Sequence, residues 1–235
     1  MTIEEKALNY LEKDTLAHID MIQVIKRGFS NIYYAGADGV AMAEKKGGVQ
    51  YLSVTHPEAG ERLLSFFNER VPVIVHQDFL ADRAVERLKL TGYNKCREFT
   101  YLKKEKTYTK VEGIEICKLS MEWLDKVSEI YHLIDEPEYI RLLLEEGVMH
   151  GAFIEGELAG FIGMHTEGCM GLLEVLPEYR RRGIGEILER YMIDWNLEKG
   201  FVPFCQVFTD NEASLRLQGK LGLTASDKYL WWVYR

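Results

Sequence analysis

The chain has 235 residues, of which 47% are hydrophobic and 28% are charged, and 37 acidic against 29 basic residues give a formal net charge of −8. This composition provides a sizeable apolar core. The acidic balance argues against a nucleic-acid partner, which needs a broad basic face. The four cysteines are scattered and the six histidines show no ligand spacing with them, so the sequence predicts no metal site.

The N-terminal segment is charged and lacks an apolar signal core, and no apolar run is long enough to span a bilayer. We therefore expect a cytoplasmic protein with no membrane partner. Few, scattered cysteines also fit a reducing compartment.

The first half of the chain alternates between helical and strand patterns. The elements expected here are, in chain order, a helical region at 3–28, strands within 31–54 broken by turn signals, a helix from Pro57, a strand at 71–77, a helix at 79–91 capped by Gly92, and a strand at 97–104.

The polar segment 103–113 divides the chain into an N-terminal domain, 1–105, and a C-terminal domain, 112–235. The elements expected in the second are a strand at 114–120, helices at 122–134 and 137–146, a hairpin at 149–165 turning at 155–157, a strand at 169–176, a helix from Ile184, a strand at 201–208, a helix capped by Asp210 or Asn211 and followed by Gly222, and a strand at 228–235. The fold class is therefore α/β (α+β). A weak repeat relates the strand–helix–strand series after Val71-Pro72 to the series after Val202-Pro203.

Residues 174–188 read "EVLPEYRRRGIGEIL" and concentrate basic charge and glycine between a strand and a helix. The first N–H groups of a helix have no partner within it, the helix dipole adds positive charge there, and glycine lets a ligand approach the backbone. This pattern suits a phosphate or pyrophosphate group. The alternative is a solvated arginine face beside an ordinary turn.

The pattern Arg180-x-x-Gly183-x-Gly185 resembles the coenzyme A signature of the GNAT acetyltransferase superfamily. A second segment, "VFTDNEASLRLQGKLGL", is similar to the strand–Asn–helix segment of the same superfamily. The resemblance covers about residues 113–235 and looks closest to the glycine N-acyltransferase (FR47-like) branch, whose members also carry a degenerate GNAT-like N-terminal half. It implies a mixed central sheet flanked by helices, in two tandem GNAT-like units.

The resemblance also implies acetyl-CoA as co-substrate and a set of residues that bind it. The main chain of Leu173, Glu174 and Val175 would pair with the pantetheine arm, as an added strand does. The pyrophosphate would be held by Arg180, Arg181, Arg182, Gly183, Ile184 and Gly185. Asn211 would lie near the pantetheine or thioester, or serve only as a helix cap.

The implied reaction is direct attack of an amine on the thioester, which requires a group that accepts the amine's proton. Glu167 is the first choice for this base, on an extended strand where it would share a face with Cys169. Glu174 and His165 are the alternatives, and Glu167 could instead be an exposed turn carboxylate. Many GNAT enzymes place an acidic tyrosine where this chain has Gln218. Ser214, one turn earlier, is therefore the candidate acid, and the alternative is that solvent or the amine's own proton protonates the thiolate.

The leading hypothesis is therefore an N-acyltransferase that moves an acetyl group to the amine of a small molecule or peptide, acting as a monomer or homodimer. The alternative is a non-catalytic acyl-CoA-binding module. The sequence does not identify the amine. The acidic stretch at 135–147 could favour a cationic amine or could be a solvated helix face.

Overall fold

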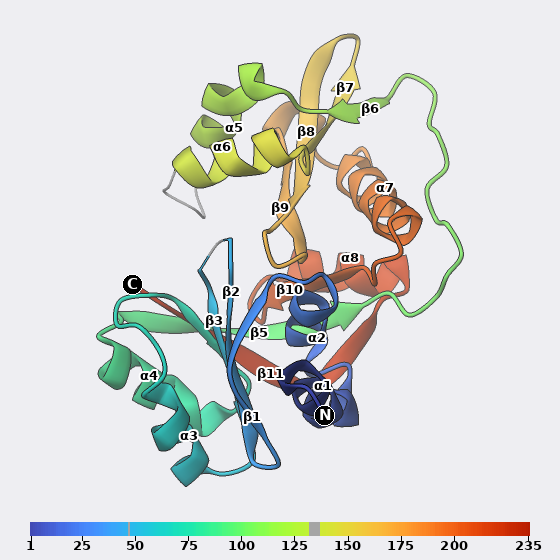
Figure 1. Cartoon of the computed structure of the whole chain (residues 1–235). Helices are drawn as coiled ribbons and strands as arrows, with labels where there is room; N and C mark the ends of the chain where they lie inside the picture. The colour runs from blue at the N-terminus through green and yellow to red at the C-terminus, as the bar shows by residue number, and fades with distance from the viewer. Residues whose placement is uncertain (47, 132–136) are drawn as a thin grey trace. The chain divides into compact units, whose positions relative to one another are not determined.

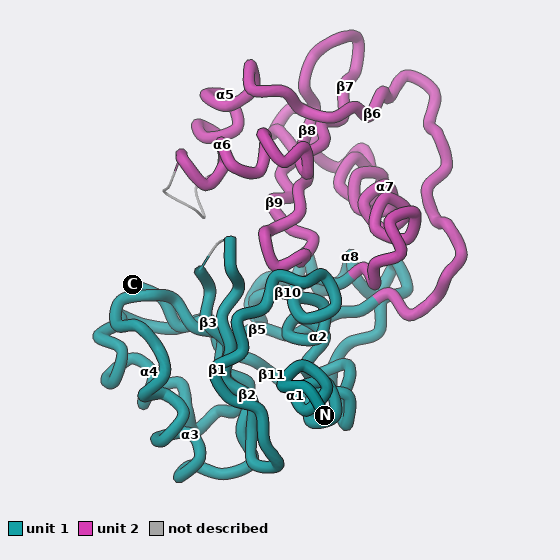
Figure 2. Tube along the Cα trace, in the orientation of Figure 1, with its two compact units in different colours: residues 1–100, 204–235 teal, residues 101–203 magenta. Residues whose placement is uncertain are grey.

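The computed structural model describes residues 1–46, 48–131 and 137–235 (Figure 1). The turn residue Gly47, the end of the helix expected at 122–134 and the start of the acidic stretch at 135–147 lie outside them. In the described part of the chain, no helix is both long and apolar enough to cross a membrane. The chain forms two compact units, unit 1 from residues 1–100 and 204–235 and unit 2 from residues 101–203 (Figure 2).

Unit 1 contains a mixed sheet with the strand order β1-β2-β3-β4-β11-β5-β10. Its strands are β1 (Ser30–Gly36), β2 (Gly39–Glu44), β3 (Gln50–Val54), β4 (Val73–Val75), β5 (Gly92–Thr100), β10 (Phe204–Phe208) and β11 (Thr224–Tyr234). The β3–β4 pair is parallel, whereas the other neighbouring pairs are antiparallel.

Helices cover both faces of this sheet. The helical elements of unit 1 are α1 (Ile3–Leu11), η1 (Glu12–Asp14), α2 (Ile19–Lys26), α3 (Pro57–Leu64), η2 (Asp78–Leu80), α4 (Ala81–Leu88) and α8 (Glu212–Leu221). Successive strand residues point to opposite faces, so Val40 and Met42 pack with α1 and α2, while Ala41 packs with α3 and α4. Both faces are buried at the centre of the sheet, where β2, β3 and β4 are buried along their whole length.

Two boundaries in unit 1 differ from the sequence prediction. The helical region expected at 3–28 is two helices, because Asp14 Oδ1 accepts the N–H of Ala17 at 3.2 Å and the His18 ring binds the Leu11 carbonyl at 3.1 Å. These bonds satisfy the backbone at a break between α1 and α2. Helix α4 ends at a left-handed Lys89, with φ 54°, whereas Gly92 begins β5.

The weak repeat corresponds to a symmetric arrangement of strands. One repeat is β4-α4-β5 and the other is β10-α8-β11, and the four strands lie in the order β4-β11-β5-β10. Exchanging β4 with β10 and β5 with β11 gives the same strand order, read from the opposite edge of the sheet. The last strand of each repeat thus lies between strands of the other, and this is why residues 204–235 belong to the same compact unit as residues 1–100 rather than following the expected division at 105–112.

Unit 2 contains an antiparallel sheet with the order β6-β7-β8-β9. Its elements are β6 (Glu115–Lys118), η3 (Met121–Trp123), α5 (Leu124–Ile130), α6 (Pro137–Glu146), β7 (His150–Ile154), β8 (Glu157–Met164), β9 (Met170–Val175), η4 (Pro177–Tyr179) and α7 (Ile184–Glu198). Helix α7 packs on β8 and β9. The expected β7–β8 hairpin is confirmed, with Glu155 and Gly156 at φ 52° and 84°, the left-handed values of a tight hairpin turn.

The polar segment expected to be a linker is bound to α7. Asp194 accepts the N–H groups of Thr107 and Tyr108 at 2.7 and 3.1 Å. The Tyr108 ring packs edge-on against Tyr191. These contacts place residues 101–113 within unit 2.

We predict opposite effects for two glycine substitutions. A methyl group at Gly160 of β8 would meet the Glu174 carbonyl oxygen at 2.6 Å, so Gly160→Ala forces β8 and β9 apart and lowers the free energy of unfolding by about 1–3 kcal/mol. A methyl group at Gly219 of α8 meets nothing within 4 Å, so Gly219→Ala stabilises the helix by about 0.5–1 kcal/mol. Urea unfolding measures both, and a neutral Gly160→Ala would contradict the close approach of the two strands.

Candidate functional site

The connection between β9 and α7 ends in an uncapped helix N-terminus. Gly183 is the N-cap of α7, with φ 80°, and as a glycine it provides no side-chain cap for the first turn. A Cβ built on Gly183 would meet nothing within 4 Å. The first N–H groups of α7 are therefore open to a ligand at the positive end of the helix dipole.

The three arginines before Gly183 have different surroundings. Arg180 Nε donates to the Val175 carbonyl at 2.9 Å, and its Nη2 lies 3.9 Å from Glu174. Arg182 lies over the Tyr179 ring, 5.4 Å from its centroid. Arg181 is exposed, has a left-handed φ of 65°, and makes no ion pair with another described residue. Of the three, Arg181 has the guanidinium most available to an anion.

Strand β9 contains a bulge that the sequence analysis did not foresee. Phe161 pairs with Glu174 and Gly163 pairs with Gly171. Two β9 residues, Leu172 and Leu173, therefore face one residue of β8, and Leu172 has a left-handed φ of 51°. A bulge leaves one residue without a ladder partner and redirects the strand. It falls within the stretch expected to present its main chain to the pantetheine arm.

The residues between β8 and β9 form a turn. The His165 N–H donates to the Cys169 carbonyl and the Gly168 N–H donates to the His165 carbonyl, both at 2.8 Å. The expected extended strand at Glu167 is therefore wrong, as is the shared face with Cys169. Glu167 is 3% exposed, so it is not an exposed turn carboxylate either. Its place in a buried hairpin turn could not be read from a strand periodicity.

A tyrosine that the sequence analysis did not single out contacts this turn. Tyr139 of α6 lies 2.9 Å from His165 Nδ1, and the Thr166 N–H donates to the Tyr139 oxygen at 3.4 Å. Burial and then the Glu167 charge raise the pKa of Tyr139. Burial lowers the pKa of His165 to about 4. At neutral pH Tyr139 therefore keeps its proton and donates it to Nδ1, which leaves the proton of His165 on Nε2.

Gly171 of β9 leaves room for the His165 ring. A Cβ built on Gly171 would lie 2.5 Å from His165 Nε2. The orientation of His165 thus depends on the absence of a side chain at Gly171 and on the hydroxyl of Tyr139.

Two expected site residues, Asn211 and Ser214, lie at the start of α8 and belong to unit 1. Asn211 Oδ1 accepts the Ser214 N–H at 3.1 Å, so Asn211 does serve as the helix cap. Gln218, one turn after Ser214, is 2% exposed, and its Oε1 has no hydrogen-bond partner among the described residues. Within unit 2, by contrast, Glu174, Val175 and Arg180 meet at the end of β9, and a Cβ on Gly185 would lie 3.6 Å from the Val175 side chain.

A bulged strand followed by a glycine turn and a glycine-capped helix N-terminus is an arrangement able to bind a phosphate group through backbone N–H groups. Residues 114–223 match the Acetyltransferase (GNAT) family. This part of the chain, which runs from β6 through α8, is a GNAT acetyltransferase domain. A comparison with curated proteins gives no significant match.

Several solved structures share the fold over nearly the whole chain. A Drosophila protein is similar with a TM-score of 0.75 and 16% identity, over 99% of this chain and 95% of that one. A GCN5-related N-acetyltransferase-like protein from Streptococcus suis has a TM-score of 0.59 and 13% identity, over 100% of both chains. A tandem GNAT protein from the clavulanic acid biosynthesis pathway has a TM-score of 0.52 and 13% identity, over 98% of this chain and 94% of that one.

We predict that Gly171→Ala raises the pKa of His165 from about 4 toward the ordinary value of about 6.5. The added methyl group displaces the ring from its buried position, so the charged form becomes easier to hydrate. NMR titration of the histidine ring measures the shift. The control is Gly163→Ala, whose methyl group would meet Met149 and Leu172 instead. An unchanged His165 pKa in Gly171→Ala would contradict the packing of the ring on this glycine.

Proposed function

We propose that the protein is an acetyl-CoA-dependent N-acetyltransferase that acts on the primary amine of a small molecule or peptide. The observation that carries the proposal is the open, glycine-capped N-terminus of α7 directly after a bulged strand, inside a GNAT domain. The residues fit the co-substrate, because an exposed arginine and free N–H groups suit a pyrophosphate. The bulge leaves a main-chain segment that is able to pair with an extended ligand.

In this proposal, acetyl-CoA supplies the activated acetyl group and the chain supplies binding and proton transfer. The N–H groups of Gly183, Ile184 and Gly185 hold the pyrophosphate, with Arg181 adding charge. The main chain of Leu173 to Val175 aligns the pantetheine arm. Arg180 closes the end of β9 and competes for the Val175 carbonyl, so pairing at that residue requires Arg180 to move.

Glu167 remains our proposed base, now as a buried carboxylate in the β8–β9 turn. His165, the second candidate, has no free nitrogen lone pair while Tyr139 donates to Nδ1 and Nε2 carries the proton, so it accepts a proton only after the hydrogen bond to Tyr139 breaks. Ser214 is retained as the candidate acid for the departing thiolate.

The buried Gln218 favours a second candidate function, a non-catalytic acyl-CoA-binding module. An amide cannot protonate a thiolate, and Gln218 occupies the position where many GNAT enzymes carry tyrosine. A thiol-release assay against amino acids, polyamines, aminoglycosides and peptide N-termini separates the two. CoA binding with no thiol release on any amine would support the module.

We also propose that residues 1–105 are a degenerate GNAT-like unit, as in the glycine N-acyltransferase branch. The symmetric order β4-β11-β5-β10 supports this, as does the whole-length similarity to a tandem GNAT protein.

We predict that Gly183→Ala raises the Kd for CoA by about tenfold or more, which corresponds to about 1.4 kcal/mol of lost binding. The methyl group has open space in the protein, so it collides only with a ligand lying against the loop. Calorimetry measures the affinity.

The matched control is Gly200→Ala, just after the other end of α7. Gly200 has φ 75° and equally open surroundings, so its substitution carries the same backbone strain of about 1–2 kcal/mol without blocking the loop. Equal CoA affinities in the two variants would sink the proposed cradle.

We predict that Glu167→Gln lowers kcat by about 10²–10⁴-fold, the usual contribution of a positioned base, while the Kd for CoA stays within about twofold of the parent value. Steady-state kinetics on an amine found in the screen gives the first value and calorimetry the second. The control is Glu157→Gln, an exposed carboxylate at the other hairpin turn of β8. Full turnover in Glu167→Gln would remove this residue as the base.

A further inference from the structure

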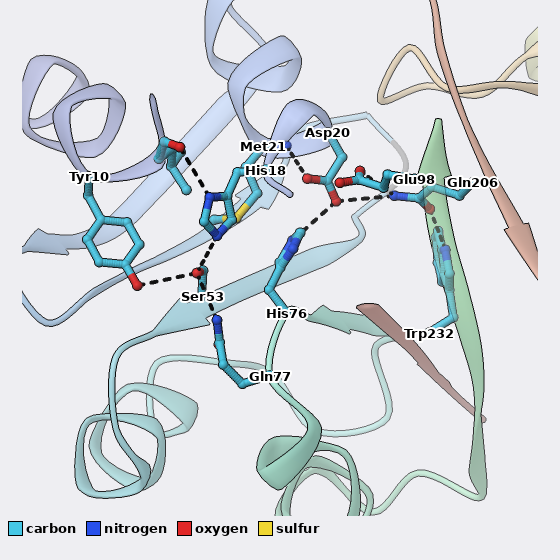
Figure 3. A network of polar contacts seen from close by, with 11 residues as sticks. Tyr10, His18, Asp20, Met21, Ser53, His76, Gln77, Glu98, Gln206 and Trp232 are labelled. Carbon is cyan, nitrogen blue, oxygen red and sulfur yellow. Dashed lines mark hydrogen bonds and ion pairs between the residues drawn. The ribbon is translucent and has the colours of Figure 1, made fainter. Parts of the chain in front are cut away.

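Three ionisable side chains that the proposed reaction does not use meet in the core of unit 1 (Figure 3). Asp20 lies in α2, His76 follows β4, and Glu98 lies in β5. They are 0%, 5% and 2% exposed. One nitrogen or oxygen from each lies within 4.8 Å of the atoms from the other two.

The protein's own hydrogen bonds leave this cluster incompletely satisfied. His76 Nε2 lies 3.3 Å from Asp20 Oδ2, but this contact lacks hydrogen-bond geometry. Both ring nitrogens of His76 and Glu98 Oε2 are buried without a hydrogen-bond partner among the described residues. Unpaired buried polar groups are expensive, so their presence together calls for an explanation.

One amide serves both carboxylates. Gln206 Nε2 donates to Asp20 at 3.2 Å and to Glu98 at 3.3 Å. The Trp232 indole N–H donates to the Gln206 oxygen at 2.6 Å, which fixes the amide with its NH₂ group toward the carboxylates. A neutral amide does not offset the charge of two buried carboxylates.

We propose that Asp20, His76 and Glu98 form a buried site for one divalent transition-metal ion. An imidazole with two carboxylates is a donor set that zinc accepts, with metal–ligand bonds of about 2.0–2.2 Å. Ligand atoms around one tetrahedral zinc lie about 3.4 Å apart. The 3.3 Å separation of His76 Nε2 and Asp20 Oδ2 already matches this distance. The other separations in the cluster, which are at most 4.8 Å, would close by up to about 1.4 Å on binding. The imidazole makes magnesium, which prefers oxygen and water, a poor match.

The site joins three segments that are distant in the sequence. A metal ion here would link α2 to two strands of the sheet, β4 and β5. Its positive charge would also offset the negative charge of the two carboxylates, which the neutral Gln206 amide does not. Because the three side chains are almost fully buried, the ion enters as the chain folds. The role is structural, and the site differs from cysteine-based motifs because its ligands carry no recognisable spacing.

The test is refolding of the full chain in the presence and absence of metal. The protein is unfolded in guanidinium chloride with a chelator, desalted, and refolded without metal or with zinc, manganese or magnesium chloride. After gel filtration, elemental analysis measures bound metal and a thermal melt measures Tm. We expect about one zinc per chain and a higher Tm than for the metal-free protein, with no retained magnesium.

Glu98→Gln and His76→Gln are expected to reduce retained zinc at least about tenfold, since each removes a ligand of a three-ligand site. The control is Tyr10→Phe, which removes a 3.4 Å contact with Ser53 in the neighbouring His18–Ser53 network (Figure 3) and leaves the three ligands intact. It should retain zinc as the parent does.

X-ray absorption on the zinc-refolded parent keeps the test decisive even where a variant fails to fold. The expected first shell contains nitrogen and oxygen only. A sulfur ligand would assign the zinc to a cysteine and overturn the proposal, as would a parent protein that retains no metal and melts at the same temperature in every refolding buffer.

Discussion

Unit 1 depends on the pairing of β5 with β11. Strand β11 lies between β4 and β5. Without it the sheet would split into a four-stranded part, β1 to β4, and a two-stranded part that consists of β5 and β10. Its residues also reach both cores, since Leu230 packs with α1 and α2 and Val233 packs with α3 and α4. Hydrogen bonding and apolar burial therefore both require this strand. The strand–helix–strand repeats are held together by exchange of their last strands, and neither repeat completes its own sheet.

In unit 2, irregular backbone is concentrated in and just before the loop between β9 and α7. The bulge at Leu172, the left-handed Arg181 and the left-handed Gly183 follow one another over a short stretch of chain. Left-handed backbone is costly for residues other than glycine, and such strain collects where a structure presents main-chain groups to a ligand. The helix after the loop packs on β8 and β9, so the irregular backbone lies between two elements that support each other.

The sequence predicted the elements of this fold well but said less about their partners. Helical periodicity and turn glycines gave the helix from Ile184 and the hairpin at Glu155, because these are local signals. The break at residues 15–18 depends on the His18 side chain reaching back to Leu11, and the left-handed cap at Lys89 has no glycine to announce it. The position of β11 between β4 and β5 is a long-range pairing that no local pattern encodes.

In the candidate site, too, the features that depend on local sequence were predicted and those that depend on long-range contacts were not. Arginine and glycine spacing located the loop before α7, and Asn211 was recognised as a possible cap. The turn at Glu167 was mistaken for an extended strand because it lies between two segments that are strands, β8 and β9. Tyr139 was missed since its contact with His165 joins α6 to the β8–β9 turn, and the cluster around Glu98 was missed because its members come from three separate segments.

The exchanged strands also determine the order in which the two units are able to fold during synthesis. A ribosome delivers β1–β5 first, then all of unit 2, and only afterwards β10 and β11. Until β11 emerges, the facing edges of β4 and β5 carry unpaired N–H and C=O groups, which invite association with other chains. Unit 2 is contiguous in sequence and able to close earlier. During synthesis, unit 2 is therefore able to fold before unit 1. The strands of residues 1–100 stay without their full sheet until β11, which is synthesised after unit 2, has emerged.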